Sequence, residues 1–351
     1  MGIASLSRLV AAPVYARFPL AIATLSRRFT WRRFINLLIV ESEYRLRRTR
    51  VAGKPYVLFV DPANICNLRC PLCSTGLQTR TGRPGFMTLD QFKAVTTPAA
   101  PTALKVNLYT WGESLLNPQI FGMIDHCRSL NLTSHLSSNL SLALTDDQID
   151  ALVRSGLDYL CVSIDGTDQH SYETYRKKGE LALVLDNVRR IMARRSALKR
   201  RLTIEWQFII MRHNEHQLEQ ARSMAAELGF DVFRAIPVGL PYGMEEDPDL
   251  ARQWFPEAHR DRNSTMRQSG LYQRTCYALY RYGVVTSDLK LSPCSYMSGP
   301  NALYDDLTKT PMVEARNNEK FRAARSLFRK GPRPAIKTGC ETCHMFKTVA
   351  Q

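Results

Sequence analysis

The chain has 351 residues, of which 44% are hydrophobic, so it is long and apolar enough to fold around a packed core as one large domain and a smaller one. This composition excludes a disordered chain. A formal charge of +16, from 48 Lys and Arg against 32 Asp and Glu, makes a nucleic acid, an anionic membrane surface or an acidic substrate the partners to consider.

Residues 1–50 carry half of the excess charge, because ten arginines and two glutamates give 10 − 2 = +8. Arg8, Arg17 and Arg27 interrupt the apolar stretches, so no run approaches the roughly 20 residues that cross a bilayer. No secretory signal pattern is present. Two interpretations remain for this segment of a cytoplasmic protein. One is a basic amphipathic segment on the inner face of an anionic membrane, and the other is a helical hairpin packed on the core with a solvated arginine face.

Strand and helix patterns alternate through the middle of the chain. Short apolar or β-branched runs predict strands at residues 56–60, 104–109, 133–136, 159–164, 202–211 and 232–238. Helical patterns fall between them at residues 89–95, 118–130, 146–155, 182–195 and 215–228. This order predicts the α/β class, with residues 51–240 forming a parallel sheet curved into a partial (β/α)6 TIM-like barrel. Residues 241–270 are predicted to be a linker and residues 271–351 a small second domain.

Three cysteines, Cys66, Cys70 and Cys73, lie in the segment DPANICNLRCPLCSTG directly after the first predicted strand. Three thiolates on one loop can hold three corners of a [4Fe–4S] cube and leave the fourth iron open for a ligand. Zinc is the alternative, but a closed zinc site needs four ligands and no fourth Cys or His lies nearby in sequence. Cys127 and Cys161 lie in apolar segments and are interpreted as core residues.

The C-x3-C-x2-C segment resembles the radical S-adenosylmethionine (radical SAM) superfamily, in which the open iron binds SAM. Three further segments resemble motifs of that family, namely YTWGESLLNP, HLSSNLSL and VSIDG, and an arginine follows them in YETYRKKG. Trp111 and Leu140 replace glycines of the family pattern, and Leu72 replaces an aromatic residue. The resemblance implies contacts to SAM from Gly112, Glu113, Ser138, Asn139, Ser163, Asp165 and Arg176.

Each of these residues also has a purely structural interpretation. Glu113 is equally typical of a first helical turn, Asn139 of a turn, and Asp165 of the cap of a helix beginning near residue 169. Arg176 lies in a basic run that is typical of a solvated surface.

The remaining four cysteines, Cys276, Cys294, Cys340 and Cys343, suffice to close one further cluster. Their arrangement resembles the twitch domain, a shortened SPASM domain with one auxiliary [4Fe–4S] cluster, although Leu289 occupies a glycine position of the SPASM pattern. A structural zinc site is the alternative.

The resemblance implies reductive cleavage of SAM to a 5′-deoxyadenosyl radical, with the electron supplied by a flavodoxin- or ferredoxin-type donor. Hydrogen abstraction from the substrate and transfer of the remaining electron to the auxiliary cluster would give a two-electron oxidation. We expect a hydroxylated small molecule, a glycan or a lipid-linked substrate. The alternatives are a peptide maturase, an RNA-modifying enzyme and a non-catalytic iron–sulfur electron carrier. The absence of a recognisable RNA-binding module argues against a nucleic-acid partner.

Overall fold

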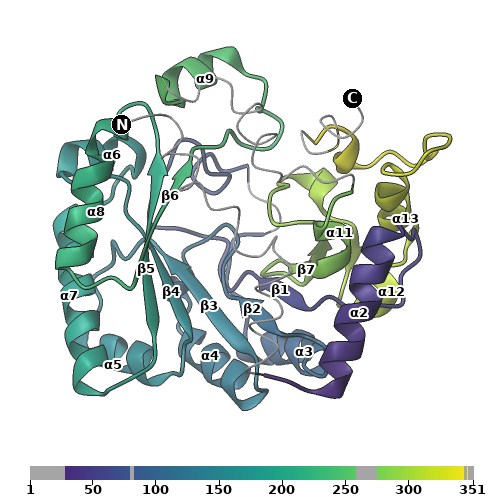
Figure 1. Cartoon of the computed structure of the whole chain (residues 1–351), viewed down its shortest axis with the longest axis horizontal. Coiled ribbons are helices and arrows are strands. Elements are labelled where there is room, and N and C mark those ends of the chain that lie inside the picture. The colour runs from purple at the N-terminus through teal and green to yellow at the C-terminus, as the bar shows by residue number, and fades with distance from the viewer. Residues whose placement is uncertain (1–27, 80–82, 258–274, 344–345, 347–351) are drawn as a thin grey trace.

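A curved parallel sheet forms the centre of the molecule in the computed structural model, which describes residues 28–79, 83–257, 275–343 and 346 (Figure 1). Its first six strands are all parallel and are paired in sequence order. They are β1 (Val57–Val60), β2 (Lys105–Asn107), β3 (Thr133–Ser138), β4 (Tyr159–Ser163), β5 (Thr203–Ile210) and β6 (Val232–Pro237). The six predicted strands are therefore confirmed within a few residues at their ends.

Helices cover the outer side of this sheet (Figure 1). They are α3 (Leu89–Ala99), α4 (Ile120–Ser129), α5 (Asp146–Arg154), α6 (Gln169–Tyr175), α7 (Leu181–Ala197) and α8 (Leu218–Glu227), with η4 (Glu215–Gln217) before α8. Thr88 and Thr145 begin α3 and α5 with capping boxes, which satisfy amides of the first helical turn. Asp168 caps α6 by accepting from the Ser171 amide at 2.9 Å, so the capping role considered for Asp165 is wrong.

The carboxyl-terminal region continues the same sheet beyond β1. Strand β7 (Tyr282–Val285) pairs parallel to β1, and β8 (Lys290–Ser292) and β9 (Asp305–Asp306) follow in antiparallel order. The described part of this region also contains the short helices α11 (Ala278–Arg281), η6 (Pro300–Ala302), α12 (Met312–Ala315), α13 (Glu319–Ser326) and η7 (Gly339–Glu341). The predicted fold class, a partial (β/α)6 barrel with a small carboxyl-terminal domain, is confirmed.

The segment predicted to be a linker contains a helix, α9 (Pro248–Trp254), which lies beyond the carboxyl ends of β5 and β6 (Figure 1). Residues 258–270 of that predicted linker lie outside the described residues. The domain boundary predicted at residue 271 also lies outside the described residues. The domain boundaries at residues 50 and 240 stay predictions.

Helix α2 (Trp31–Arg45) packs against α11 and lies beside the carboxyl-terminal helices (Figure 1). A buried ion pair joins the two elements, because the Arg281 guanidinium donates to both carboxylate oxygens of Glu41 at 2.8 and 2.7 Å. The other part of the predicted amino-terminal segment, residues 1–27, lies outside the described residues. No helix among the described residues is long and apolar enough to cross a membrane.

Candidate cofactor sites at the carboxyl ends of the strands

The first three cysteines lie together on the loop that leaves β1. Each thiol is near enough to the others for their charges to interact, and apolar side chains of Leu68 and Trp254 pack around the loop. Burial raises the pKa of Cys66 to about 12, and the Glu113 carboxylate adds to that rise. Burial also raises the pKa of Cys70 to about 11, opposed by the Arg176 guanidinium. Ligation by a cationic iron centre would favour the thiolate form of such buried groups.

The loop after β2 is pressed against this cysteine loop at Gly112. A Cβ atom at Gly112 would lie 1.8 Å from the carbonyl oxygen of Ala63, so no larger residue fits there. The next residue, Glu113, is buried and caps η3 (Ser114–Leu116), as its Oε1 accepts from the Leu115 amide at 3.1 Å. Its Oε2 accepts from the Asn139 amide at 2.8 Å. Glu113 therefore caps this helix from the position directly before its first turn, rather than lying in the first turn, and the same side chain also joins the loop after β2 to the end of β3.

Ser138 and Asn139 stand at the end of β3, beside the first cysteine. The side-chain amide of Asn139 points its Nδ2 at Cys66 Sγ, 3.7 Å away, and donates to Asn67 Oδ1 at 3.1 Å. The turn interpretation of Asn139 also holds, because its Oδ1 accepts from the Ser141 amide at 2.8 Å. Asn67, which the sequence reasoning missed, joins the two loops by donating to the Ser141 carbonyl at 2.6 Å.

Asp165 and Arg176 form a buried pair beside the second cysteine. Arg176 Nε donates to Asp165 Oδ2 at 2.6 Å, and Arg176 Nη1 lies 4.0 Å from Cys70 Sγ. Asp165 also accepts from the Ile209 amide at 2.7 Å, and burial raises its pKa. The side chain of Arg176 is only 13% exposed, so the solvated-surface interpretation of this residue is wrong. Ser163 is buried at the end of β4, two residues before Asp165.

The other four cysteines line one cavity of about 190 Å³ in the carboxyl-terminal region. Cys276 precedes α11, Cys294 follows β8, Cys340 lies in η7 (Gly339–Glu341), and Cys343 follows η7. Burial raises the pKa of both Cys276 and Cys294 to about 11, and the Tyr304 hydroxyl lies 3.3 Å from Cys340 Sγ. The structure thus brings together thiols from four separate segments.

Among the residues that the structure describes, no group of three or more His, Cys, Asp and Glu side chains is arranged to hold a metal ion. The soft thiolate donors nevertheless suit an iron–sulfur cluster, three on the first loop and four around the second cavity. The residues of both sets therefore fit such clusters in number and chemistry.

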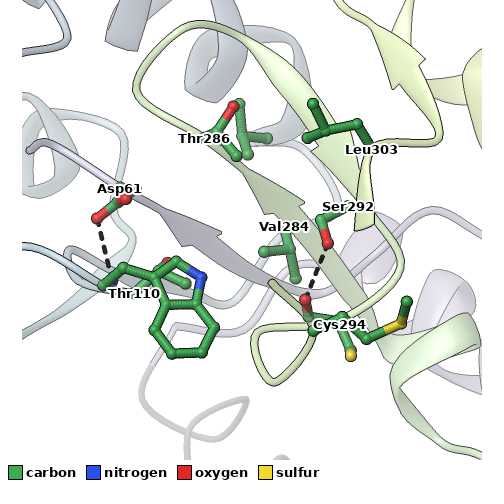
Figure 2. A pocket seen from close by; sticks show the side chains of 10 residues that line it. Asp61, Thr110, Val284, Thr286, Ser292, Cys294 and Leu303 are labelled. Carbon is green, nitrogen blue, oxygen red and sulfur yellow. Dashed lines mark hydrogen bonds between the residues drawn. The ribbon is translucent and has the colours of Figure 1, made fainter. Parts of the chain in front are cut away.

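A small pocket of about 10 Å³, room for about one water molecule, lies beside Cys294 of the second set and is also lined by Asp61 and Val285. Figure 2 shows Asp61 and Thr110 on one side of this pocket and Ser292 and Cys294 on the other. Asp61 Oδ1 accepts from the Trp111 amide at 3.4 Å. Burial raises the pKa of Asp61 to about 7, although backbone amides of the loop after β2 oppose that rise. The sequence reasoning did not select Asp61, although its place directly after β1 was a usable signal.

The three-cysteine loop lies at the carboxyl end of the first strand of a curved parallel sheet. Functional loops of α/β proteins gather at this edge, and three thiolates there would leave one iron of a [4Fe–4S] cluster open. Residues 60–204 match the model of the family described as "Radical SAM superfamily". Over these residues, less than half of the chain, the protein is similar to radical SAM enzymes. The predicted cofactors, a SAM-binding [4Fe–4S] cluster, SAM and an auxiliary cluster, agree with the family.

Curated relatives resemble only part of the chain. A PqqA peptide cyclase of Methylorubrum populi is 30% identical over 180 residues, which is 51% of this chain and 45% of the relative. An AdoMet-dependent heme synthase of Methanosarcina barkeri is 24% identical over 204 residues, which is 56% of each chain. The chain thus spans about half the length of these relatives.

Solved structures resemble the fold over more of the chain. Streptococcus suis SuiB bound to S-adenosylmethionine aligns with a TM-score of 0.63 at 13% identity, covering 90% of this chain and 76% of SuiB. AnSMEcpe with bound AdoMet aligns with a TM-score of 0.53 at 15% identity, covering 84% of this chain and 97% of the other. At these identities, the likeness establishes the fold and not the substrate.

Proposed function

We propose that Cys66, Cys70 and Cys73 bind three irons of the SAM-binding [4Fe–4S] cluster. The observation that supports this assignment best is that polar side chains from two other segments lie beside cysteines of this loop. Asn139 lies beside Cys66 and Arg176 beside Cys70. When bound, the cluster and SAM supply a 5′-deoxyadenosyl radical that abstracts hydrogen from an unactivated carbon.

The residues around the loop have the charges that SAM requires. The Glu113 carboxylate is an acceptor for an ammonium group, and the Arg176 guanidinium is a donor for a carboxylate. Buried partners hold both side chains in place, namely the Asn139 amide for Glu113 and Asp165 for Arg176. We assign SAM binding to Gly112, Glu113, Ser138, Asn139, Ser163, Asp165 and Arg176.

We assign a second [4Fe–4S] cluster, of the twitch or SPASM type, to Cys276, Cys294, Cys340 and Cys343. Four thiolates complete the ligand shell of such a cluster, so it has no open iron and suits electron transfer. Its position beyond β1 supports a two-electron oxidation in which this site accepts the second electron. A flavodoxin- or ferredoxin-type protein is the proposed source of the first electron.

A peptide is the substrate class that the relatives favour. The similar proteins include a PqqA peptide cyclase and SuiB bound to the precursor peptide SuiA. The second candidate is a small molecule, the class to which the expected hydroxylated, glycan or lipid-linked substrate belongs. It is favoured by relatives named GTP 3′,8-cyclase and pre-heme d1 synthase.

The experiment that tests this function is an assay of anaerobically reconstituted protein with SAM and a reductant. The wild type should release 5′-deoxyadenosine, the Cys70→Ala variant should release none, and a Cys127→Ala variant should still release it. Cys127 is the matched control because it is a buried cysteine of α4 outside both sets. Release by Cys70→Ala at the wild-type rate would exclude the assignment. A substrate that is oxidised should yield a product lighter by a pair of hydrogen atoms.

A further inference from the structure

Helix α2 has large apolar side chains on its outer face, while its inner face buries polar side chains beside Leu37, Val40 and Tyr44. Its buried face includes Arg33, Asn36 and Glu41. Arg33 donates to the carbonyl oxygens of Ala100, Leu130 and Asn131 at 3.0, 3.2 and 2.9 Å. Helices on the surface of a globular protein usually have polar and charged residues on the face turned away from the core, so the apolar side chains on the outer face of α2 are unusual.

The outer face of α2 is apolar and carries positive charge. Seven residues of the helix are exposed, and four of them are large and apolar. They are Trp31, Arg32, Ile35, Leu38, Ile39, Ser42 and Arg45. With the flanking Phe29 and Leu46, residues 29–46 hold six of the eleven large apolar side chains that are exposed in the described part of the chain. Single exposed apolar residues are normal, whereas a gathered patch marks a contact surface.

Neither acidic residue of the helix lies on this outer face. Glu41 is buried against Arg281, and Glu43 is half-buried and accepts from the amides of Ala52 and Gly53. Arg48 and Arg50, just beyond the helix, are exposed as well. All charged side chains that are exposed on α2 are therefore arginines, and they lie around the apolar stripe.

We propose that the outer face of α2 docks on an anionic lipid membrane, with α2 lying in the plane of the interface. An apolar stripe flanked by arginines is the pattern of interfacial helices, in which apolar side chains enter the headgroup region while arginines attract anionic lipid. Trp31 supports this occupant, because Trp concentrates at the boundary between lipid and water. A second copy of the chain fits less well, since pairing this face with itself would bring arginines together.

Flotation of the full-length reconstituted protein with vesicles tests the proposal. The wild type should float with vesicles of phosphatidylglycerol mixed with phosphatidylcholine and remain behind with phosphatidylcholine alone. Changing Ile35 and Leu38 together to Gln should weaken binding at least roughly tenfold, because fewer apolar side chains enter the interface. Changing Arg32 and Arg45 together to Gln should weaken binding roughly 30-fold at low salt.

An Ile336→Gln variant is the matched control, since Ile336 is 36% exposed and lies outside this face. It should bind anionic vesicles like the wild type. The melting temperature of the Ile35→Gln/Leu38→Gln variant should equal that of the wild type, because both side chains are exposed. A clear fall in its melting temperature would mean that another part of the chain covers α2 and would overturn the proposal. Equal vesicle binding by the variant, or a dimer that dissociates in the variant, would also overturn it.

Discussion

Buried charged side chains hold the loops of the proposed SAM site in a defined arrangement. Glu113, Asp165 and Arg176 are each held by protein partners within hydrogen-bonding distance. A buried ion pair adds little net stability relative to well-packed apolar residues, because both charges lose their hydration. The presence of the Asp165–Arg176 pair is therefore better explained by a positioning role beside the cysteine loop than by stability.

At the same scale, Asp61 should make stability depend on pH. Its folded-state pKa of about 7 exceeds the ordinary value of 3.8, so the folded chain holds this proton more tightly than the unfolded chain. The contribution of Asp61 to stability is present below pH 4 and is lost as the pH rises through 7. The Asp61→Asn variant lacks this titrating group and should not lose that stability. The difference in melting temperature, variant minus wild type, should therefore increase by a few degrees between pH 4 and pH 7.

Differential scanning fluorimetry under anaerobic conditions measures this difference, with the exposed Asp90→Asn as the control. Comparing variant and wild type at each pH removes the contribution of other titrating groups. A difference between Asp61→Asn and wild type that stays constant over the whole window would contradict the prediction.

At the scale of elements, the strands were predictable because each is a short apolar or β-branched run bounded by polar turns. The proposed SAM contacts were named from a resemblance to family motifs, and most of them lie at or after the end of a predicted strand. Helix α9 was not predicted as an element, because it has only seven residues and lies in polar sequence, whereas a helix beginning near residue 169 was expected where α6 is found. The role of α9 depends on tertiary contacts, which place Trp254 against Tyr175 and the cysteine loop.

Trp254 should therefore protect the first cluster from oxygen. Its side chain is buried among Leu68, Cys70 and Leu72, so Trp254→Ala would open a cavity beside the loop. We expect faster loss of iron–sulfur absorbance in air and a fall in stability of about 3–5 kcal/mol. Arg252→Ala on the exposed side of α9 is the control and should bleach at the wild-type rate. Identical bleaching of the Trp254→Ala protein would show that α9 does not shield the loop.

At the scale of the whole molecule, one continuous sheet carries both sets of cysteines. The parallel pairing of β7 with β1 joins segments far apart in the chain, with Asp61 donating its amide to the Val285 carbonyl at 2.9 Å. No local pattern reveals this pairing, since it depends on which strand edge the barrel leaves open. The sequence therefore predicted two cysteine sets and a second domain, but not their common sheet or the pocket that Asp61 and Cys294 line.

Because the two sets occupy different parts of this sheet, they should be separable by mutation. The wild type should bind about eight irons, as two four-iron clusters require, and Cys340→Ala/Cys343→Ala should retain about four. This variant should still release 5′-deoxyadenosine, because Cys66, Cys70 and Cys73 are intact, but it should not convert a substrate that the wild type oxidises. Replacing Cys66, Cys70 and Cys73 by Ala should abolish both activities.

Metal binding and folding are coupled, so each variant must first be shown to be soluble and to hold its remaining cluster. If the intact Cys340→Ala/Cys343→Ala variant forms oxidised product at the wild-type rate, the second site is structural and the oxidative assignment fails.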